Sequence, residues 1–349
     1  MEISDHTKTQ CLVVGAGALG LLLAYVLENS SAGRQGRLAV RVNNRSPLAE
    51  TVEFNLGLLG RKNFRSSVDT AEPEEWLNSC DTHSLPTVVF LCTPPELTQD
   101  IFFQWLSAFA SRFPQREVQF VFCNNGILTP QTLAAIALKQ AQQVNLSFIR
   151  ALFFVGSLRS KEAKKVEVQW TGGRRVIWDF LSHGSQHAFE LMQNWLGKDF
   201  AAESTQVDQL GFMEWQHEGE ITRIEREKFF TNFMLAAGIG PNLAKNKTLS
   251  QVISEREVAE LAEQFADLWQ AHRIERDALI QMLRTTVNAT SENINSLSYS
   301  GAFGNSATMA WFLSTLTEDI RHSTRAEKHL QLTQFLNSVR LKWGMPNEH

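Results

Sequence analysis

The chain has 349 residues, which is long for a single hydrophobic core and suits two domains. Its 43% hydrophobic and 20% charged residues are typical of a globular protein, and its net charge of −4 argues against nucleic acid and anionic membranes as partners. A signal peptide and an apolar run of about 18 residues are both missing, so we expect a cytoplasmic protein with no membrane span.

The first half of the chain alternates short apolar runs with helical patterns. Apolar strands that alternate with helices predict a parallel sheet covered on both faces. We expect strands at residues 10–14, 38–42, 87–92, 119–123, 148–154 and 166–170, helices at 21–27 and 97–109, and a turn at Gly172–Gly173.

After about Glu218 the pattern changes to apolar residues at helical spacing, as in Phe229, Phe230, Phe233 and Met234. Residues 288–306, which are rich in Ser, Asn and Gly, predict a loop or insertion between helices. The predicted fold class is therefore α/β. It comprises a Rossmann-type domain over residues 1–218 and an all-helical domain over residues 219–349.

A glycine-rich string directly follows the first predicted strand and opens the first predicted helix. Glycines in this context allow a tight turn and a close approach of the backbone to phosphate, and the helix dipole favours the negative charge. The order of strand, turn and helix therefore predicts the pyrophosphate site of a nicotinamide dinucleotide. The residues of this glycine turn are Gly15, Ala16, Gly17, Ala18, Leu19 and Gly20.

The end of the second predicted strand bears on the choice between NADH and NADPH. NAD-binding Rossmann domains usually place Asp or Glu there, about 20 residues after the turn, to bind the ribose 2′-hydroxyl. This chain instead offers Arg41, Asn43, Asn44 and Arg45. An arginine suits a 2′-phosphate, so we expect NADPH with Arg45 as its ligand, although Arg45 could also be a merely solvated side chain.

Two further groups of polar residues could carry chemistry. Asn124, Asn125 and Gly126 follow the predicted strand at 119–123, where open α/β sheets bind ligands, but they could equally form an ordinary Asn-Gly turn. Lys228 and Asn232 are four residues apart and share one helical face. A lysine among apolar neighbours can become a proton donor near neutral pH, whereas a solvent-facing lysine is the commoner case.

In their order along the chain, these features resemble the ketopantoate reductase (2-dehydropantoate 2-reductase) family. GAGALG at 15–20 is similar to the family's opening motif, and NNG at 124–126 to its Asn-Gly motif. TGGRRVIW at 171–178 resembles its late hairpin, and EKFFTN at 227–232 its K-x-x-x-N helix. TEDIRHSTRAE at 317–327 resembles the segment that ends on the family's glutamate. The resemblance spans nearly the whole chain.

The resemblance implies a role for each matching residue. Lys228 would be the general acid that protonates the ketone oxygen during hydride transfer from NADPH. Glu327 would hold the substrate hydroxyl, Asn232 would position substrate, and Asn125 would contact both cofactor and substrate. The implied substrate is a small 2-keto acid, and by analogy with the family the helical half could form a homodimer.

The chain departs from the family pattern mainly at substrate contacts. Ala236 stands where the family has a second asparagine, and Cys92 and Thr93 stand where a lysine follows the third strand. The Asn-x-x-Ser segment is split. Asn293 and Ser296 match its first part, while Thr315 matches its continuation, so either Ser296 or Thr315 could take the role of the serine.

The leading prediction is NADPH-dependent reduction of a small branched 2-keto acid, of the ketopantoate-to-pantoate type used in pantothenate biosynthesis. The alternatives are a non-catalytic NADP-binding protein and a related 2-hydroxy-acid or opine-type dehydrogenase. The nine histidines form no HExxH pattern and the four cysteines no CxxC pair, so we expect no metal. We expect the cysteines to be reduced core residues.

Overall fold

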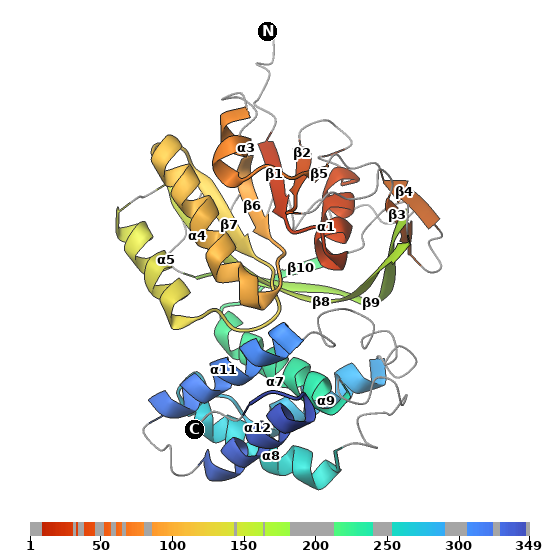
Figure 1. Cartoon of the computed structure of the whole chain (residues 1–349), viewed down its shortest axis with the longest axis vertical. Coiled ribbons are helices and arrows are strands. Elements are labelled where there is room, and N and C mark those ends of the chain that lie inside the picture. The colour runs from red at the N-terminus through yellow and green to blue at the C-terminus, as the bar shows by residue number, and fades with distance from the viewer. Residues whose placement is uncertain are drawn as a thin grey trace. The chain divides into compact units, whose positions relative to one another are not determined.

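Figure 1 shows the computed structural model of the chain, which divides into two compact units. The first unit contains residues 1–93, 97–124 and 130–219, and the second contains residues 94–96, 125–129 and 220–349. The structure describes residues 9–30, 33, 38–45, 52–56, 61–64, 68–79, 86–142, 145–162, 165–181, 213–239, 253–289, 306–323 and 329–346.

In the described part of the first unit, the strands form a single sheet with the order β4-β3-β9-β8-β7-β6-β1-β2-β5, and β10 pairs with β9. Neighbouring strands from β2 through β1, β6 and β7 to β8 are all parallel. The strands are β1 (Thr9–Val14), β2 (Leu38–Asn43), β3 (Val52–Asn55), β4 (Arg61–Phe64), β5 (Val68–Asp69), β6 (Pro86–Leu91), β7 (Val118–Phe122), β8 (Leu146–Glu162), β9 (Lys165–Phe180) and β10 (Glu214–His217).

Helices cover both faces of the parallel part of this sheet (Figure 1). Phe102 of α4 (Pro95–Arg112) packs against Phe120 and Phe122 of β7 on one face. On the other face, α1 (Ala18–Glu28) shares a core with Val121 and Cys123. The predicted Rossmann-type sheet is thereby confirmed. The remaining described helices of this unit are α3 (Pro73–Ser79) and α5 (Pro130–Gln142).

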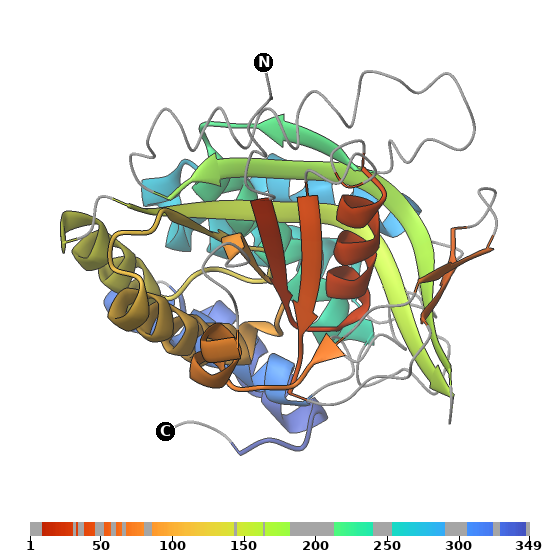
Figure 2. The same ribbon diagram turned by 90° about the horizontal axis from the view of Figure 1, so that it is seen from above.

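Helix α1 is buried along its whole length from Gly20 to Leu27. A helix that is apolar all round needs cover on every side, and the sheet supplies only one side. Figure 2 shows that β8 and β9 are long strands that curve past the sheet around α1. Val166 and Val168 of β9 belong to the same core as α1, so the hairpin closes the side that the sheet leaves open.

The predicted turn at Gly172–Gly173 is wrong, because both glycines lie inside β9, which runs antiparallel to β8 as far as Lys165. Gly173 has a φ of +73°, and the pairing register shifts near Gly156 of β8. A side chain at Gly173 would overlap the Phe154 carbonyl oxygen. The glycines therefore permit the bend that carries the hairpin around α1, instead of ending the strand.

Four strands escaped the sequence prediction because they are short and partly polar: β3, β4, β5 and β10. β3 and β4 form an antiparallel pair, and β3 also pairs in parallel with the outer part of β9. Val52 and Phe54 of β3 are fully buried and belong to the α1 core. Buried and half-buried positions alternate along β3, and this burial depends on the pairing of β3 with β9.

The described part of the second unit is helical, as predicted. Phe229 and Phe233 of α7 pack against Phe312 of α11, and Phe265 of α8 packs against both Phe230 and Phe233. These aromatic contacts form the centre of a separate hydrophobic core. The helices are α7 (Ile221–Ile239), α8 (Glu255–Leu268), η6 (Gln270–His272), α9 (Arg276–Ala289), α11 (Ser306–His322) and α12 (Leu330–Lys342).

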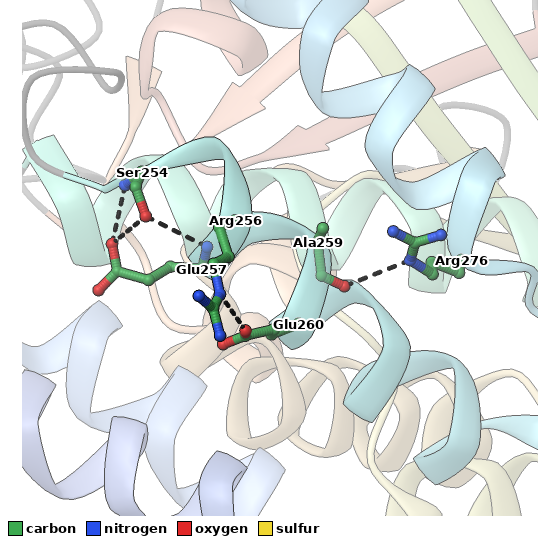
Figure 3. Close-up of polar contacts among 6 residues, drawn as sticks. All are labelled: Ser254, Arg256, Glu257, Ala259, Glu260 and Arg276. Carbon is green, nitrogen blue, oxygen red and sulfur yellow. Dashed lines mark hydrogen bonds and ion pairs between the residues drawn. The ribbon is translucent and has the colours of Figure 1, made fainter.

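Polar contacts fix the start of α8 (Figure 3). The Ser254 hydroxyl accepts a hydrogen bond from the Glu257 backbone N–H, and the Glu257 carboxylate accepts one from the Ser254 N–H at 2.8 Å. This capping box satisfies two donors that would otherwise have no helical partner. The Glu257 carboxylate also accepts a hydrogen bond from the Ser254 hydroxyl at 2.7 Å. This bond and the one from the Ser254 N–H lower the pKa of Glu257.

Three of the four cysteines lie within the described residues, and the prediction of reduced core thiols holds for them. Cys11, Cys92 and Cys123 are buried and free. Burial raises the pKa of the Cys11 thiol far above its ordinary value, so this thiol stays protonated. Among the helices of the described residues, none is long and apolar enough to cross a membrane.

Candidate functional site

The glycine turn between β1 and α1 has the backbone geometry that its sequence predicts. Gly15 has a φ of +103°, and its N–H donates to the Asn43 carbonyl at 2.8 Å. A Cβ at Gly15 would lie 2.8 Å from the Cys92 carbonyl oxygen, and one at Gly20 would overlap the Gly15 carbonyl oxygen. Residues 15 and 20 therefore must be glycine for the turn to close against β2 and β6.

The third glycine leaves the start of α1 open. Gly17 is the N-cap and is exposed, and no described residue lies within 4 Å of the position that its Cβ would take. Among the described residues, no side chain caps α1, and the first turn of this helix contains no acidic residue. The first amides of a helix need acceptors and carry partial positive charge, so this end is suited to bind an anion such as a phosphate.

The end of β2 carries the basic residue that the sequence predicts as a 2′-phosphate ligand. Arg45 is exposed, and its guanidinium donates to the neutral Gln104 side chain at 3.2 Å. Asn43 is buried and donates to the Ala71 carbonyl at 3.0 Å, while Arg41 lies over the Trp76 ring. The contact of Arg45 is exposed and goes to an uncharged group, so a phosphate could replace it.

Lys228 and Asn125 meet in the second unit, although 103 residues separate them in the chain. The Lys228 Nζ donates to the Asn125 Oδ1 at 2.8 Å, and both residues are half-buried. Lys228 is held by α7, whose neighbouring Phe229 is fully buried in the helical core. The structure therefore places an ammonium group and a side-chain amide where together they could hold a polar substrate oxygen.

Gly126 lets the segment that carries Asn125 pack closely against α11. Its φ is +110°, and a Cβ there would overlap the Trp311 ring of α11. Trp311 in turn lies 6.0 Å, centroid to centroid, from the Phe229 ring. Contact with an aromatic ring therefore fixes the backbone beside Asn125, and this contact requires a glycine.

Asn232 lies one helical turn after Lys228 and is 9% exposed. Its Nδ2 has no hydrogen-bond partner among the described residues. Burying an amide donor without an acceptor costs about 1–3 kcal/mol, so a ligand that accepts a hydrogen bond from Asn232 would recover this cost. Ala236, a further turn along, is 2% exposed in the helical core and offers no polar group.

Of the remaining predicted site residues, the structure describes only Thr315. Asn293, Ser296 and Glu327 lie outside the described residues. Thr315 is half-buried in α11, one turn beyond Phe312, which packs against α7. Thr315 is thus the one of the two alternatives for the family serine that the structure describes.

Two sets of polar contacts were not predicted from the sequence. Arg150 of β8 is fully buried and donates to the Phe122 carbonyl at 2.8 Å and to the Asn124 carbonyl at 2.9 Å. The Thr308 hydroxyl of α11 donates to both Glu96 carboxylate oxygens at 3.1 and 3.2 Å. The only sequence signal for Arg150 was a charged residue inside an otherwise apolar strand. The sequence contained no signal for the contact between Thr308 and Glu96.

Within the described residues, no group of His, Cys, Asp and Glu is arranged to hold a metal ion. A dinucleotide is the cofactor that the observed groups suit, because the first unit offers an open helix start and an exposed arginine.

No protein-family model and no curated protein matches the sequence. Solved structures do match. A ketopantoate reductase from Ralstonia eutropha JMP134 is 12% identical with a TM-score of 0.62, covering 96% of this chain and 99% of that chain. D-mandelate dehydrogenase in complex with NADH is 13% identical with a TM-score of 0.57, covering 96% and 98%. NADP⁺-bound yersinopine dehydrogenase is 12% identical with a TM-score of 0.54, covering 97% and 99%. The chain therefore has the fold of ketopantoate reductases and related dehydrogenases.

Proposed function

We propose that this protein is an NADPH-dependent oxidoreductase that reduces a small branched 2-keto acid of the ketopantoate type. The observation that carries the proposal is the 2.8 Å contact between the Lys228 ammonium and the Asn125 amide oxygen. The resemblance in sequence and the likeness in fold to ketopantoate reductases both support it. The Nδ2 of Asn232, which has no partner among the described residues, adds a substrate donor one turn away.

NADPH, when bound, supplies the hydride that is transferred to the keto carbon. The glycine turn would hold the pyrophosphate, and Arg45 would pair with the 2′-phosphate. Lys228 would give its proton to the ketone oxygen as the negative charge develops there, so that ketone, hydride and proton yield the alcohol. Solvent then reprotonates the lysine.

Asn125 and Asn232 would act by binding and orientation. The Asn125 Oδ1 holds the ammonium in place, and the Asn232 Nδ2 can donate to a substrate oxygen. Thr315, or Ser296 in its place, and Asn293 would add substrate contacts, and Glu327 would hold a substrate hydroxyl. These last roles rest on the family resemblance.

The first test is NADPH oxidation in the presence of ketopantoate, compared with other branched 2-keto acids. Lys228→Ala should lower kcat by about a hundredfold to ten thousandfold, because general-acid catalysis contributes about that much. The affinity for NADPH should hardly change. Lys342→Ala, an exposed lysine on α12 of the same unit, is the matched control and should keep full activity. Equal turnover in the Lys228→Ala and wild-type proteins would remove Lys228 from the mechanism.

Asn232 is tested separately through substrate binding. Asn232→Ala removes the buried donor and should lower kcat/KM by about tenfold to a hundredfold, the value of a hydrogen bond to a charged substrate. The effect should fall on the keto acid and leave the dinucleotide affinity unchanged. An unaltered kcat/KM would mean that Asn232 faces no substrate.

The second candidate is a dehydrogenase of the same fold acting on another substrate, a 2-hydroxy acid or an opine. The fold likeness to D-mandelate and yersinopine dehydrogenases favours it, as does the apolar Ala236 at a family substrate position. Activity with an amino-acid-derived keto acid and none with ketopantoate would select it. Tight NADPH binding with no turnover on either would select the non-catalytic alternative. A homodimer through the helical unit and a role in pantothenate biosynthesis stay predictions.

A further inference from the structure

Arg159 connects the outer part of β8 to the glycine turn. Its backbone pairs with Val168 of β9, whose side chain belongs to the same core as α1. Its guanidinium Nη1 donates to the Ala16 carbonyl at 2.7 Å, across 143 residues of chain. Ala16 directly precedes Gly17, the open N-cap of α1. The hairpin thus brings a positive charge to the turn that is proposed to hold the dinucleotide.

The charge on Arg159 is only partly compensated within the protein. The side chain is half-buried, and loss of water lowers the pKa of its guanidinium. Among the residues that the structure describes, its partner is a neutral carbonyl, and it forms no ion pair with a carboxylate. Withdrawing a cation from water without an anion costs free energy, which a bound anion would return.

The Arg159 guanidinium has more N–H donors than its contact with Ala16 uses. An arginine has five N–H donors in a rigid fork, and the Ala16 carbonyl accepts from one of them. A second branch can therefore donate to a phosphate oxygen while the first still holds the turn. The exposed N-cap and the first amides of α1 attract the same anion.

We propose that Arg159 is a dinucleotide-binding residue that completes the pyrophosphate site from the β8–β9 hairpin. This inference rests on the dinucleotide site of the proposed function and does not depend on its catalytic step. The pyrophosphate is the anion assigned to Arg159 because Ala16 belongs to the turn that faces it. The 2′-phosphate is assigned to Arg45, at the end of β2.

The test measures dissociation constants of NADPH and NADH for the full-length protein by calorimetry. Arg159→Gln keeps a neutral donor for the Ala16 carbonyl and removes the charge. It should weaken both dinucleotides by about tenfold to a hundredfold, because both contain the pyrophosphate. Arg45→Gln should weaken NADPH alone. Arg112→Gln, an exposed arginine at the end of α4, is the matched control and should bind both normally.

Salt dependence and apo-protein stability separate a charge contact from a structural role. The wild-type affinity should fall more steeply with salt than that of Arg159→Gln, whose melting temperature without ligand should match the wild type. Normal binding of both dinucleotides by Arg159→Gln, a loss confined to NADPH, or equal salt slopes would each overturn the proposal. Wild-type binding of neither dinucleotide would overturn it together with the proposed function. Wild-type binding without turnover would refute the reductase alone.

Discussion

Replacing Arg150 with Met is the most direct test of how the end of β7 is held. Met preserves much of the aliphatic volume but removes every donor. The Phe122 and Asn124 carbonyls lose their short bonds of 2.8 and 2.9 Å, and the Asn124 Oδ1 loses a longer and weaker bond of 3.4 Å. Hydrogen bonds to a charged group contribute about 1.5–3 kcal/mol each. The buried cation offsets part of this sum, so we expect a net loss of about 3 kcal/mol.

Urea unfolding followed by tryptophan fluorescence and circular dichroism measures this loss as a lower midpoint. Arg112→Met, on the exposed end of α4, is the control and should stay within about 0.5 kcal/mol of the wild type. Arg150→Lys keeps the charge, but an ammonium group lacks the forked donors that reach two carbonyls. Its urea midpoint should therefore lie between those of Arg150→Met and Arg112→Met. A midpoint for Arg150→Met equal to that of the control would refute this account of the buried arginine.

The other predictions concern two glycines and a helix cap. Gly126→Ala forces a side chain onto the Trp311 ring at a φ of +110° and should cost about 1–3 kcal/mol in urea unfolding, while also lowering turnover. Gly20→Ala should abolish NADPH binding in a calorimetric titration, because its Cβ would overlap a backbone carbonyl of the turn. Ser254→Ala should cost about 1 kcal/mol at pH 7. The lowered pKa of Glu257 means that the cap stabilises above the ordinary pKa of this carboxyl and loses strength as the pH falls below about 4. The difference between the Ser254→Ala and wild-type melting temperatures should therefore shrink in acid, and a constant difference would contradict the assignment.

Local patterns were enough to predict the glycine turn and the central parallel strands. The glycine turn depends on its own backbone, and the apolar strands at 87–92 and 119–123 are buried on both faces, so each is visible without its neighbours. The Gly172–Gly173 pair misled because glycine serves both a turn and a bend within a strand. Only the packing of the hairpin around α1 decides between them.

The candidate site was less accessible to sequence reasoning, because its members come from distant parts of the chain. Spacing alone placed Lys228 and Asn232 on one helical face, but only the family resemblance connected them with Asn125. The structure brings Lys228 and Asn125 into contact, and their roles stay predictions. Arg159 could not be selected from sequence, because its contact with Ala16 depends on the curvature of two paired strands.

The discontinuous make-up of the two units affects how the chain folds as it leaves the ribosome. β3 emerges early, but its partner residues in β9 come more than a hundred positions later, since Val52 pairs with Val166. Ile127 likewise belongs to a helical core whose other members follow residue 220. Pairings of such large sequence separation form slowly and leave apolar segments exposed in the meantime. A nascent chain that ends before β9 therefore presents an unpaired strand edge at β3, where binding of a chaperone would prevent aggregation.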